Sequence, residues 1–181
     1  SDQGYFLGEH GFFDKRMMLE QSSRMPFVIR YPKDLPQNKR NKALLMNIDI
    51  PALLLDYAQV SLPKHLQGES FRTLLKDDQS KGRTYTYYRY WEHSPDRPAH
   101  FGIRSDRYKL IHYYGKPLQM KSANKQETEP SWEFYDLQKD PQELTNLFEN
   151  YKYQSEILKM HKALIIQKAY YEDHQPEVPS L

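Results

Sequence analysis

Residues 100–114, which read HFGIRSDRYKLIHYY, decide the fold of this chain of 181 residues. Two runs rich in aromatic and β-branched residues, 101–104 and 108–114, flank the short polar sequence Ser105-Asp106-Arg107. Such runs favour strands, and a short polar link between two of them is typical of a tight hairpin. The stretch therefore predicts two antiparallel strands joined by a tight turn.

Further strands are expected on both sides of this hairpin in the sequence. Residues 84–91, TYTYYRYW, and residues 132–137, WEFYDL, have the same aromatic and β-branched character. Four segments of this kind predict a four-stranded antiparallel sheet. Residues 153–171 predict a long helix that packs one face on this sheet, because apolar residues recur there at helical spacing. These apolar residues are Ile157, Leu158, Leu164, Ile165 and Ala169.

Two segments beside the long helix also carry local signals. A further helix is expected to begin at Asp140, with this carboxylate as its cap and Pro141 in its first position. Residues 172–181 contain two prolines and are expected to fray.

The part of the chain before the sheet predicts one strand and two helices. The apolar run FVIRY at 27–31 is short, branched and bounded by prolines, which indicates a buried strand. Asp49 is the expected N-cap of a helix that continues through the leucine-rich residues 52–58, with Pro51 in its first turn. A short helical stretch is expected at 71–75.

Composition excludes several classes of protein. The 26 Lys and Arg residues and 24 Asp and Glu residues leave a net charge of +2, too small a field to recruit nucleic acid or an acidic membrane. No apolar run approaches the roughly 20 residues that a helix needs to cross a bilayer. The sequence has no cysteine, which excludes disulfides, thiolate metal sites and a cysteine nucleophile within it. Neither nucleic acid nor a membrane is therefore expected as a partner, and the residues alone leave the cellular location open.

Residues able to carry chemistry are concentrated in the first sixteen, SDQGYFLGEHGFFDKR. Asp2 and Gln3 can offer two oxygen ligands to a hard divalent cation, and Gly4 allows a turn that points both at one ion. Taken alone, Asp-Gln-Gly is a turn in most proteins. Lys15 carries a compact ammonium that can neutralise the oxygens of a bound anion, although a lysine within a run of charges is usually solvated.

Segments spread over nearly the whole chain resemble the type I sulfatases of the alkaline-phosphatase superfamily. The first is Asp2-Gln3 followed by the frame LGEHG at 7–11 and DKR at 14–16. The other segments follow in the order seen in that family, and together they are highly specific. They are NIDIP at 47–51, QGESF at 67–71, YYRYWEH at 87–93, HFGIRSDRYKLI at 100–111, WEFYDL at 132–137 and DPQELTNL at 140–147. Among the relatives, bacterial carbohydrate sulfatases of the N-acetylglucosamine-6-sulfatase-like kind look most similar.

The resemblance implies a hydrolase of sulfate esters, with this chain as the C-terminal part of a longer enzyme. Asp2 and Gln3 would bind calcium with ligands from outside the chain, and Lys15 would be the catalytic residue that grips the sulfate. Glu9 and His10 are expected to brace the loop by hydrogen bonds, with a substrate contact by His10 as the alternative. The family's formylglycine nucleophile arises from a Cys/Ser-x-Pro/Ala-x-Arg motif that this sequence lacks, so the chain by itself is expected to be inactive. The resemblance also suggests a periplasmic or exported enzyme.

A sulfated saccharide is the expected substrate, and one edge of the predicted sheet offers side chains that suit it. Trp91, Glu92 and His93 end one strand, and His100 begins the next. An indole face can stack on a pyranose ring, and a carboxylate and imidazoles can hydrogen-bond its hydroxyls. The alternative for these residues is structural, with Trp91 in the core and the histidines bonded within the fold.

The predicted fold class is α+β. Residues 1–66 are assigned to the end of an alkaline-phosphatase-like α/β domain, and residues 67–181 to a subdomain with a four-stranded antiparallel sheet packed with helices. Two other functions stay open at this point. One is a phosphodiesterase or phosphonate monoester hydrolase of the same superfamily, and the other is a non-catalytic interaction domain.

Overall fold

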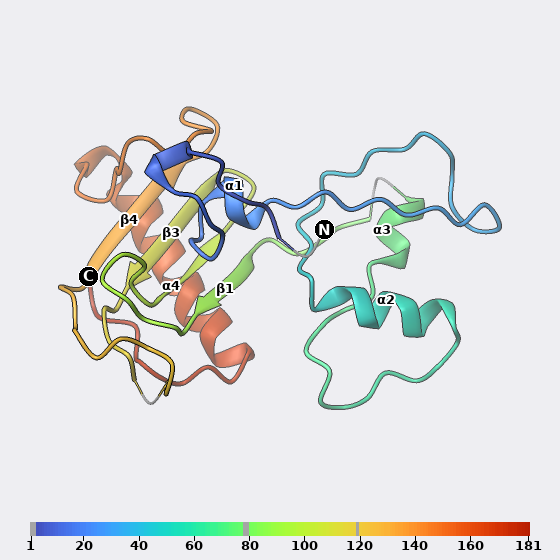
Figure 1. Ribbon diagram of the computed structural model, residues 1–181. Coiled ribbons are helices and arrows are strands. Elements are labelled where there is room, and N and C mark those ends of the chain that lie inside the picture. Colours follow the sequence, from blue (N-terminus) through green and yellow to red (C-terminus); the bar gives the residue numbers. More distant parts are fainter. Residues whose placement is uncertain (1–2, 78–79, 119) are drawn as a thin grey trace. The chain divides into compact units, whose positions relative to one another are not determined.

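Figure 1 shows the computed structural model of the chain, which describes residues 3–77, 80–118 and 120–181. The chain folds into two compact units. Ser1–Pro26 together with Tyr87–Leu181 form the first unit, and Phe27–Thr86 form the second. The boundary predicted at residue 66 concerns the domains of a larger enzyme, and it stays a prediction.

The first unit is built on the predicted four-stranded sheet, which confirms the α+β class. Its strands lie in the order β1-β2-β3-β4. They are β1 (Thr86–Tyr90), β2 (His100–Arg104), β3 (Tyr108–Tyr113) and β4 (Ser131–Asp136). β2 and β3 pair antiparallel, with His100 opposite Tyr113 and Arg104 opposite Lys109, so the hairpin prediction is confirmed. β3 and β4 also pair antiparallel.

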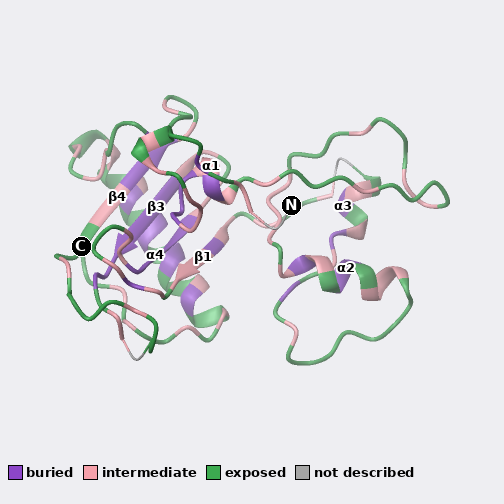
Figure 2. Ribbon diagram, viewed as in Figure 1, coloured by how far each residue is buried: buried purple, intermediate pink, exposed green. Residues whose placement is uncertain are grey.

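Both faces of this sheet are covered, and its two central strands, β2 and β3, are largely buried (Figure 2). Successive side chains of a strand point to opposite faces. On one face, Ile111, Tyr113 and Tyr135 pack against the N-terminal segment, including Met17–Leu19. On the other face, α4 (Gln154–Tyr170) packs against β2 and β3. The sheet therefore separates the long helix from the segment that carries the sequence motif (Figure 1).

The long helix forms where it was predicted, but part of its packed face differs from the prediction. Its buried residues are Ile157, Met160, His161, Ala163, Leu164 and Lys168. Leu158 and Ile165 were expected on this face and are instead 45% and 46% exposed. Among the described helices, none combines the length and the apolar character that crossing a membrane requires.

The helix predicted to begin at Asp140 is not formed. Residues 140–150 make a series of turns, and Glu143 adopts a left-handed conformation with φ 55°. The Glu143 N–H bonds to the Asp140 carbonyl at 3.1 Å, and the Asp140 carboxylate accepts the Thr145 N–H at 2.8 Å. Asp140 therefore caps a turn and not a helix, because the left-handed conformation of Glu143 does not allow a helix to continue after Pro141.

The C-terminal segment 172–181 is also more firmly held than predicted. The Asp173 carboxylate accepts hydrogen bonds from the Tyr87 hydroxyl and from Arg89, and it pairs with Lys168 at 3.1 Å. The ring of His161 bonds through Nε2 to the Pro179 carbonyl at 2.7 Å. These contacts hold the tail against β1 and α4, so the expectation of fraying is wrong.

The second unit contains α2 (Asp49–Tyr57) and α3 (Arg72–Lys76), both at predicted places. Its core contains Leu53, Phe71 and Leu74. Asp49 is the first residue of α2 rather than its N-cap. Its buried carboxylate instead accepts the N–H groups of Met46 and Glu69 and pairs with Arg83 at 2.7 Å.

The strand predicted at residues 27–31 is not formed. Val28 is 92% exposed, and no strand of the described chain pairs with this segment. Ile29 packs against the core around Leu53, and the ring of Phe27 lies edge-on to that of Phe71. The apolar run is therefore only partly used here, because alternate side chains contact the unit and no neighbouring strand satisfies its backbone.

Three short helices complete the described structure. They are η1 (Glu9–Gly11), α1 (Glu20–Ser23) and η2 (Tyr151–Tyr153). η1 and α1 belong to the N-terminal segment of the first unit and bracket the lysine that the motif singled out.

Candidate functional site

The motif residues 3–16 form a closed loop, called here the motif loop, on one face of the sheet. The Phe6 N–H bonds to the Asp14 carbonyl at 2.7 Å, and the Gly8 N–H bonds to the Phe12 carbonyl at 3.0 Å, so the two arms of the loop lie together. Phe6 is fully buried and packs with Met17–Leu19 on the sheet. The loop is thus anchored by an apolar residue inside it, and its polar residues surround this anchor.

Gly4 fixes one end of the motif loop through a close approach. A Cβ atom at this position would lie 2.0 Å from the carbonyl oxygen of Gln21. The Gly4 N–H bonds to the Ser22 carbonyl at 2.7 Å. The residue is therefore small because the backbone packs directly on α1 there, a reason that differs from the turn predicted from the sequence.

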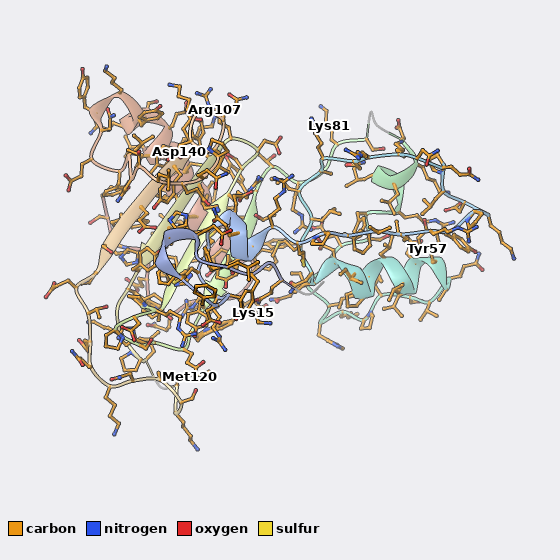
Figure 3. The ribbon with its side chains drawn as sticks, turned by 45° about the horizontal axis from the view of Figure 1, so that its top comes forward. Lys15, Tyr57, Lys81, Arg107, Met120 and Asp140 are labelled. Carbon is orange, nitrogen blue, oxygen red and sulfur yellow. The ribbon has the colours of Figure 1, made fainter. Side chains whose placement is uncertain are left out.

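Lys15 lies on the motif loop between η1 and α1 (Figure 3). It is half-buried, and its backbone N–H bonds to the Asp14 carboxylate. Arg16 pairs with the same carboxylate at 2.6 Å, and Arg97 forms a second ion pair with it. Burial acts to raise the pKa of Asp14, but the Lys15 N–H and the two guanidiniums outweigh burial and hold that pKa below its usual range. Asp14 is thus an anion at neutral pH that anchors the backbone beside Lys15.

The residue after Lys15 has an unusual backbone. Arg16 adopts φ 99°, a conformation that residues with side chains rarely adopt. Its N–H donates to the Ser22 hydroxyl at 2.9 Å, and its carbonyl accepts a hydrogen bond from the Tyr88 hydroxyl. Both polar backbone atoms of Arg16 are thus bonded to side chains from outside the motif loop.

Glu9 and His10 lie in η1 and differ in their contacts. The Glu9 carboxylate accepts the Leu7 N–H at 2.6 Å, which is the loop-bracing bond expected of it. His10 adopts a left-handed φ of 53°, and its ring lies edge-on to Phe6 with centroids 6.1 Å apart. The Nε2 atom of His10 is buried and makes no hydrogen bond to the described residues. The substrate contact suggested for His10 therefore stays a prediction.

The residues proposed to bind a saccharide do not meet on one surface. Trp91 is 53% exposed, so it does not belong to the core, and it faces the guanidinium of Arg89 at 5.3 Å. Glu92 is half-buried and accepts a long hydrogen bond of 3.4 Å from the Tyr90 hydroxyl. Trp91 and Glu92 therefore remain accessible for the predicted saccharide contact.

His93 and His100 are both buried within the first unit. His93 bonds through Nε2 to the Gln126 carbonyl at 2.8 Å, and its Nδ1 accepts the Ala99 N–H at 3.2 Å. His100 bonds through Nδ1 to the Pro98 carbonyl at 2.7 Å. Burial lowers the pKa of His100 to about 4, so its ring is neutral at neutral pH. These contacts favour the structural alternative for both histidines, and their substrate role stays a prediction.

The metal-binding residues proposed from the sequence are only partly visible. Asp2 lies outside the described residues, and Gln3 is half-buried beside Gly4. Within residues 3–77, 80–118 and 120–181, no group of three or more His, Cys, Asp and Glu side chains is placed to hold a metal ion. The described chain could thus contribute the amide oxygen of Gln3 to a calcium site, but not a complete set of ligands.

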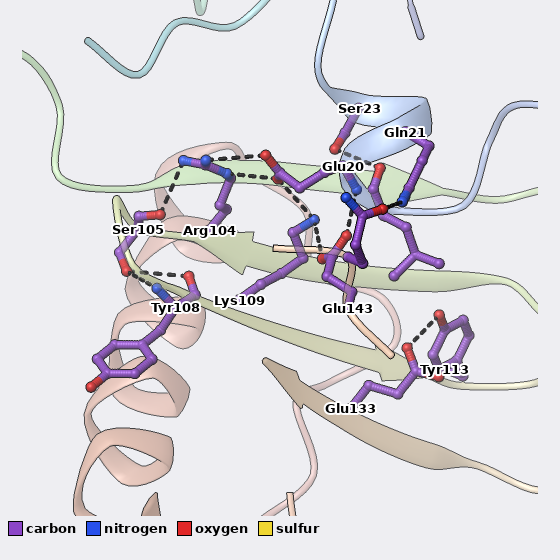
Figure 4. Close-up of polar contacts among 12 residues, drawn as sticks. Glu20, Gln21, Ser23, Arg104, Ser105, Tyr108, Lys109, Tyr113, Glu133 and Glu143 are labelled. Carbon is purple, nitrogen blue, oxygen red and sulfur yellow. Dashed lines mark hydrogen bonds and ion pairs between the residues drawn. The ribbon is translucent and has the colours of Figure 1, made fainter. Parts of the chain in front are cut away.

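A buried charge cluster, which the sequence reading missed, holds the segment that follows Lys15 (Figure 4). Lys109 on β3 is fully buried and pairs with Glu20 at 3.0 Å and with Glu143 at 2.6 Å. Glu20 also pairs with Arg104 at 2.8 Å, and its N–H donates to Glu143 at 2.6 Å. A lysine at an inward position between Tyr108 and Leu110 was the available signal, because such a charge requires a buried partner.

The pKa values of this cluster show which charges it stabilises. Burial acts to raise the pKa of Glu20, but the Lys109 ammonium and the Arg104 guanidinium lower it to about 2. Burial raises the pKa of Glu143, and Lys109 only partly offsets this effect. Glu20 is therefore the firmly ionised carboxylate, and it ties α1 to the hairpin β2–β3.

The chain belongs to the family described as N-sulphoglucosamine sulphohydrolase, C-terminal, whose model matches residues 8–170. It is 38% identical to an N-acetylglucosamine-6-O-sulfatase from Bacteroides thetaiotaomicron, over 98% of this chain and 30% of that protein. The chain spans about a third of the length of the curated relatives it matches. The resemblance to sulfatases drawn from the motifs is thereby confirmed.

Solved structures agree with this assignment. The structure of BT4656 in complex with its substrate D-glucosamine-2-N,6-O-disulfate matches with a TM-score of 0.85 and 36% identity, covering 97% of this chain and 34% of that chain. A phosphonate monoester hydrolase of Agrobacterium radiobacter matches with a TM-score of 0.77 but only 21% identity, over 94% of this chain and 34% of that chain. The second match shows the shared fold and nothing further.

Proposed function

We propose that the complete protein is a sulfuric ester hydrolase that removes sulfate from a saccharide of the glucosamine 6-sulfate type. The observation that carries this proposal is the 38% identity to an N-acetylglucosamine-6-O-sulfatase across 98% of this chain. The alignment spans 98% of this chain, so the likeness is not confined to one motif.

Lys15 is the residue of this chain proposed to act on the sulfate group. Hydrolysis breaks the bond between sulfur and the ester oxygen, and negative charge is concentrated on the sulfate oxygens and the leaving oxygen. A compact ammonium beside these oxygens stabilises the charge more in the transition state than in the bound substrate. The position of Lys15 on a loop braced by Asp14 and by the sheet supports this role, because a charge acts best when its position is fixed in advance.

Two further parts of the active site are assigned by the family resemblance. Asp2 and Gln3 would supply oxygen ligands to calcium, together with acidic ligands from elsewhere in the protein. A formylglycine would provide the nucleophile, and this sequence has neither the cysteine nor the motif from which that group is made. Lys15, Asp2 and Gln3 would then contribute the binding of sulfate and metal, and Trp91 and Glu92 would contact the sugar.

The experiment that tests this proposal compares two neighbouring variants of the complete enzyme. Lys15→Ala should lower kcat on N-acetylglucosamine 6-sulfate by about 100-fold, the scale of losing one preorganised charge contact. Arg16→Ala is the matched control, because it removes an adjacent cation whose partner Asp14 keeps its ion pair with Arg97. It should leave kcat within a few-fold of the unmodified enzyme.

The outcomes separate the proposal from its rivals. Equal losses in the two variants would show that Lys15 has no special role. Faster turnover of an aryl phosphonate monoester or a phosphodiester than of any sulfate ester would favour the second hydrolase class. The chain of residues 1–181 by itself serves as the inactive reference, and turnover of a sulfate ester by it would contradict the assignment of the nucleophile to another part of the protein.

A further inference from the structure

The strongest unexplained feature beside Lys15 is the backbone of the next residue. Arg16 lies at φ 99°, where a side chain crowds the backbone and where glycine is normally found. Residues held in sparsely populated conformations persist only when the surrounding structure over-determines them, and they are concentrated at functional sites. The contacts that hold Arg16 in this conformation therefore also set the direction in which Lys15 leaves the backbone.

Two side chains hold the peptide groups on either side of Arg16. The Ser22 hydroxyl accepts the Arg16 N–H at 2.9 Å, and the Tyr88 hydroxyl donates to the Arg16 carbonyl. Ser22 belongs to α1 and is buried, whereas Tyr88 belongs to β1 and packs at the edge of the core beneath the motif loop. The backbone conformation at residue 16 is thus dictated by a strand that lies 72 residues further along the chain.

The ring of Tyr88 is itself fixed from below. His100 stacks on it with the ring centroids 5.6 Å apart and an angle of 16° between the planes. His100 is fully buried, and its Nδ1 bonds to the Pro98 carbonyl at 2.7 Å, so this ring cannot turn freely. Burial raises the pKa of Tyr88 to about 12, which keeps its hydroxyl protonated and able to donate throughout the neutral range.

We propose that Tyr88 is a positioning residue for the sulfate-binding lysine, which it holds in place by donating a hydrogen bond to the Arg16 carbonyl. This inference rests on the proposed function, in which Lys15 binds the sulfate group. Without the hydroxyl, Arg16 returns to a negative φ, and the Lys15 ammonium moves away from the sulfate oxygens. A displacement of about 1 Å at a reacting group is enough to lower turnover substantially.

The neighbouring residue provides a matched control. Tyr87 also belongs to β1, and its hydroxyl donates to the Asp173 carboxylate. Successive strand residues point to opposite faces, so Tyr87 lies on the side of the C-terminal segment and Tyr88 on the side of the motif loop. Tyr87→Phe and Tyr88→Phe each remove one hydroxyl and one hydrogen bond from the same strand, and only the second bond reaches the backbone beside Lys15.

The test measures kcat and KM of the complete enzyme on N-acetylglucosamine 6-sulfate. Tyr88→Phe should lower kcat by on the order of tenfold with a smaller change in KM, because Lys15 acts mainly on charge that develops in the transition state. Tyr87→Phe should leave kcat close to that of the unmodified enzyme. Ser22→Ala, which removes the second bond to Arg16, should lower kcat in the same manner as Tyr88→Phe.

Rescue distinguishes positioning from a loss of stability. Glycine adopts a positive φ without steric cost, so Arg16→Gly alone should stay active, and Tyr88→Phe/Arg16→Gly should recover most of the kcat lost in Tyr88→Phe. Equal effects of Tyr87→Phe and Tyr88→Phe, or the absence of rescue, would overturn the inference. Full activity of Tyr88→Phe together with loss of activity in Lys15→Ala would overturn this inference and leave the proposed role of Lys15 standing. Full activity of Lys15→Ala would overturn the proposed role of the lysine and this inference with it.

Discussion

Replacing Lys109 by methionine should destabilise the first unit far more than the same substitution at an exposed lysine. Methionine keeps much of the length and apolar volume of the lysine stem and removes the ammonium. That ammonium pairs with Glu20 at 3.0 Å and with Glu143 at 2.6 Å, and the side chain of Lys109 is fully buried (Figure 4). The substitution therefore leaves two carboxylates facing a site that no longer contains their shared cation.

The magnitude follows from the burial of the three partners. Removing one partner of a buried ion pair typically costs about 3–5 kcal/mol, because the remaining charge has lost its solvent and its counter-ion. Glu20 keeps Arg104 at 2.8 Å, so the uncompensated charge falls mainly on Glu143, which has no exposed side-chain surface. Glu143 can escape part of the cost by binding a proton, since its pKa is already raised by burial. We therefore expect a loss of about 3 kcal/mol, the lower end of that range.

Urea unfolding followed by circular dichroism measures this loss. The matched control is Lys139→Met, because Lys139 is 66% exposed and lies 4.0 Å from Asp136, and it should cost less than about 1 kcal/mol. Glu143→Gln combined with Lys109→Met should be less unstable than the sum of the single variants, since each removes the same contact. A loss below about 1 kcal/mol in Lys109→Met would refute the reasoning, because it would mean that the cluster is solvated.

Two further predictions concern pH and the saccharide contact. The pKa values of His100 and His112 are both lowered from 6.5 to about 4, in each case mainly by burial, so the unfolded chain takes up protons first as the pH falls. The free energy of unfolding should therefore be largest above pH 6.5 and should fall by about 3 kcal/mol per histidine as the pH drops from 6.5 toward 4. Urea unfolding across this range tests the prediction, and the pH dependence should be weaker in His100→Phe. A free energy of unfolding that does not change with pH would contradict it. Trp91→Ala in the complete enzyme should raise KM for the sulfated saccharide several-fold and leave KM for 4-nitrophenyl sulfate unchanged. The reason is that an exposed indole can contact the sugar but not the sulfate. His93→Ala is the control, because its bonded and buried ring should affect both substrates equally, and a uniform effect of Trp91→Ala would withdraw the sugar contact.

Local signals in the sequence were sufficient to predict the sheet. The aromatic and β-branched runs of residues 100–114 form strands, and the polar link between them forms the turn. The helix of residues 153–171 was equally accessible, since its position depends on helical spacing. Which face of that helix is buried depends on more distant residues. Lys168 is buried because Asp173 pairs with it and the ring of Phe101 lies beneath its ammonium. The packed face of the helix therefore contains a charged residue, whereas the apolar Ile165 is exposed.

Two of the failed predictions, the helix at Asp140 and the strand at 27–31, have a similar physical cause. Asp140 and Pro141 are good signals for the start of a helix. Glu143, however, adopts a left-handed conformation, and its carboxylate pairs with Lys109. The run at 27–31 has the composition of a strand, but a strand also requires a neighbour that satisfies its backbone. In both segments the local preference was correctly identified, but residues distant in the sequence decided the structure. The segment at Asp140 has such a contact, and the segment at 27–31 lacks the neighbouring strand it needs.

The candidate site divides in the same way. The motif placed Lys15 on a loop, and the structure shows that loop and its anchor Phe6. Tyr88 and Ser22 could not be identified from sequence spacing, because their role depends on the positive φ of Arg16. A side chain that bonds to a backbone carbonyl produces no recognisable sequence pattern, so the bond is found only in the folded structure.

Two motif segments that are distant in the sequence meet beside the motif loop in the folded chain. The segment DPQE at 140–143 contributes Glu143, and the segment YKLI at 108–111 contributes Lys109. Both side chains contact Glu20, which begins α1 shortly after Lys15. Apolar packing of Met17–Leu19 on the sheet is non-directional and could tolerate a shift of the segment along the surface. Hydrogen bonds and ion pairs at its two ends, from Tyr88 to Arg16 and from Lys109 to Glu20, allow only one register. The position of Lys15 is therefore a property of the whole sheet, and substitutions at these distant signatures should act on it together rather than independently.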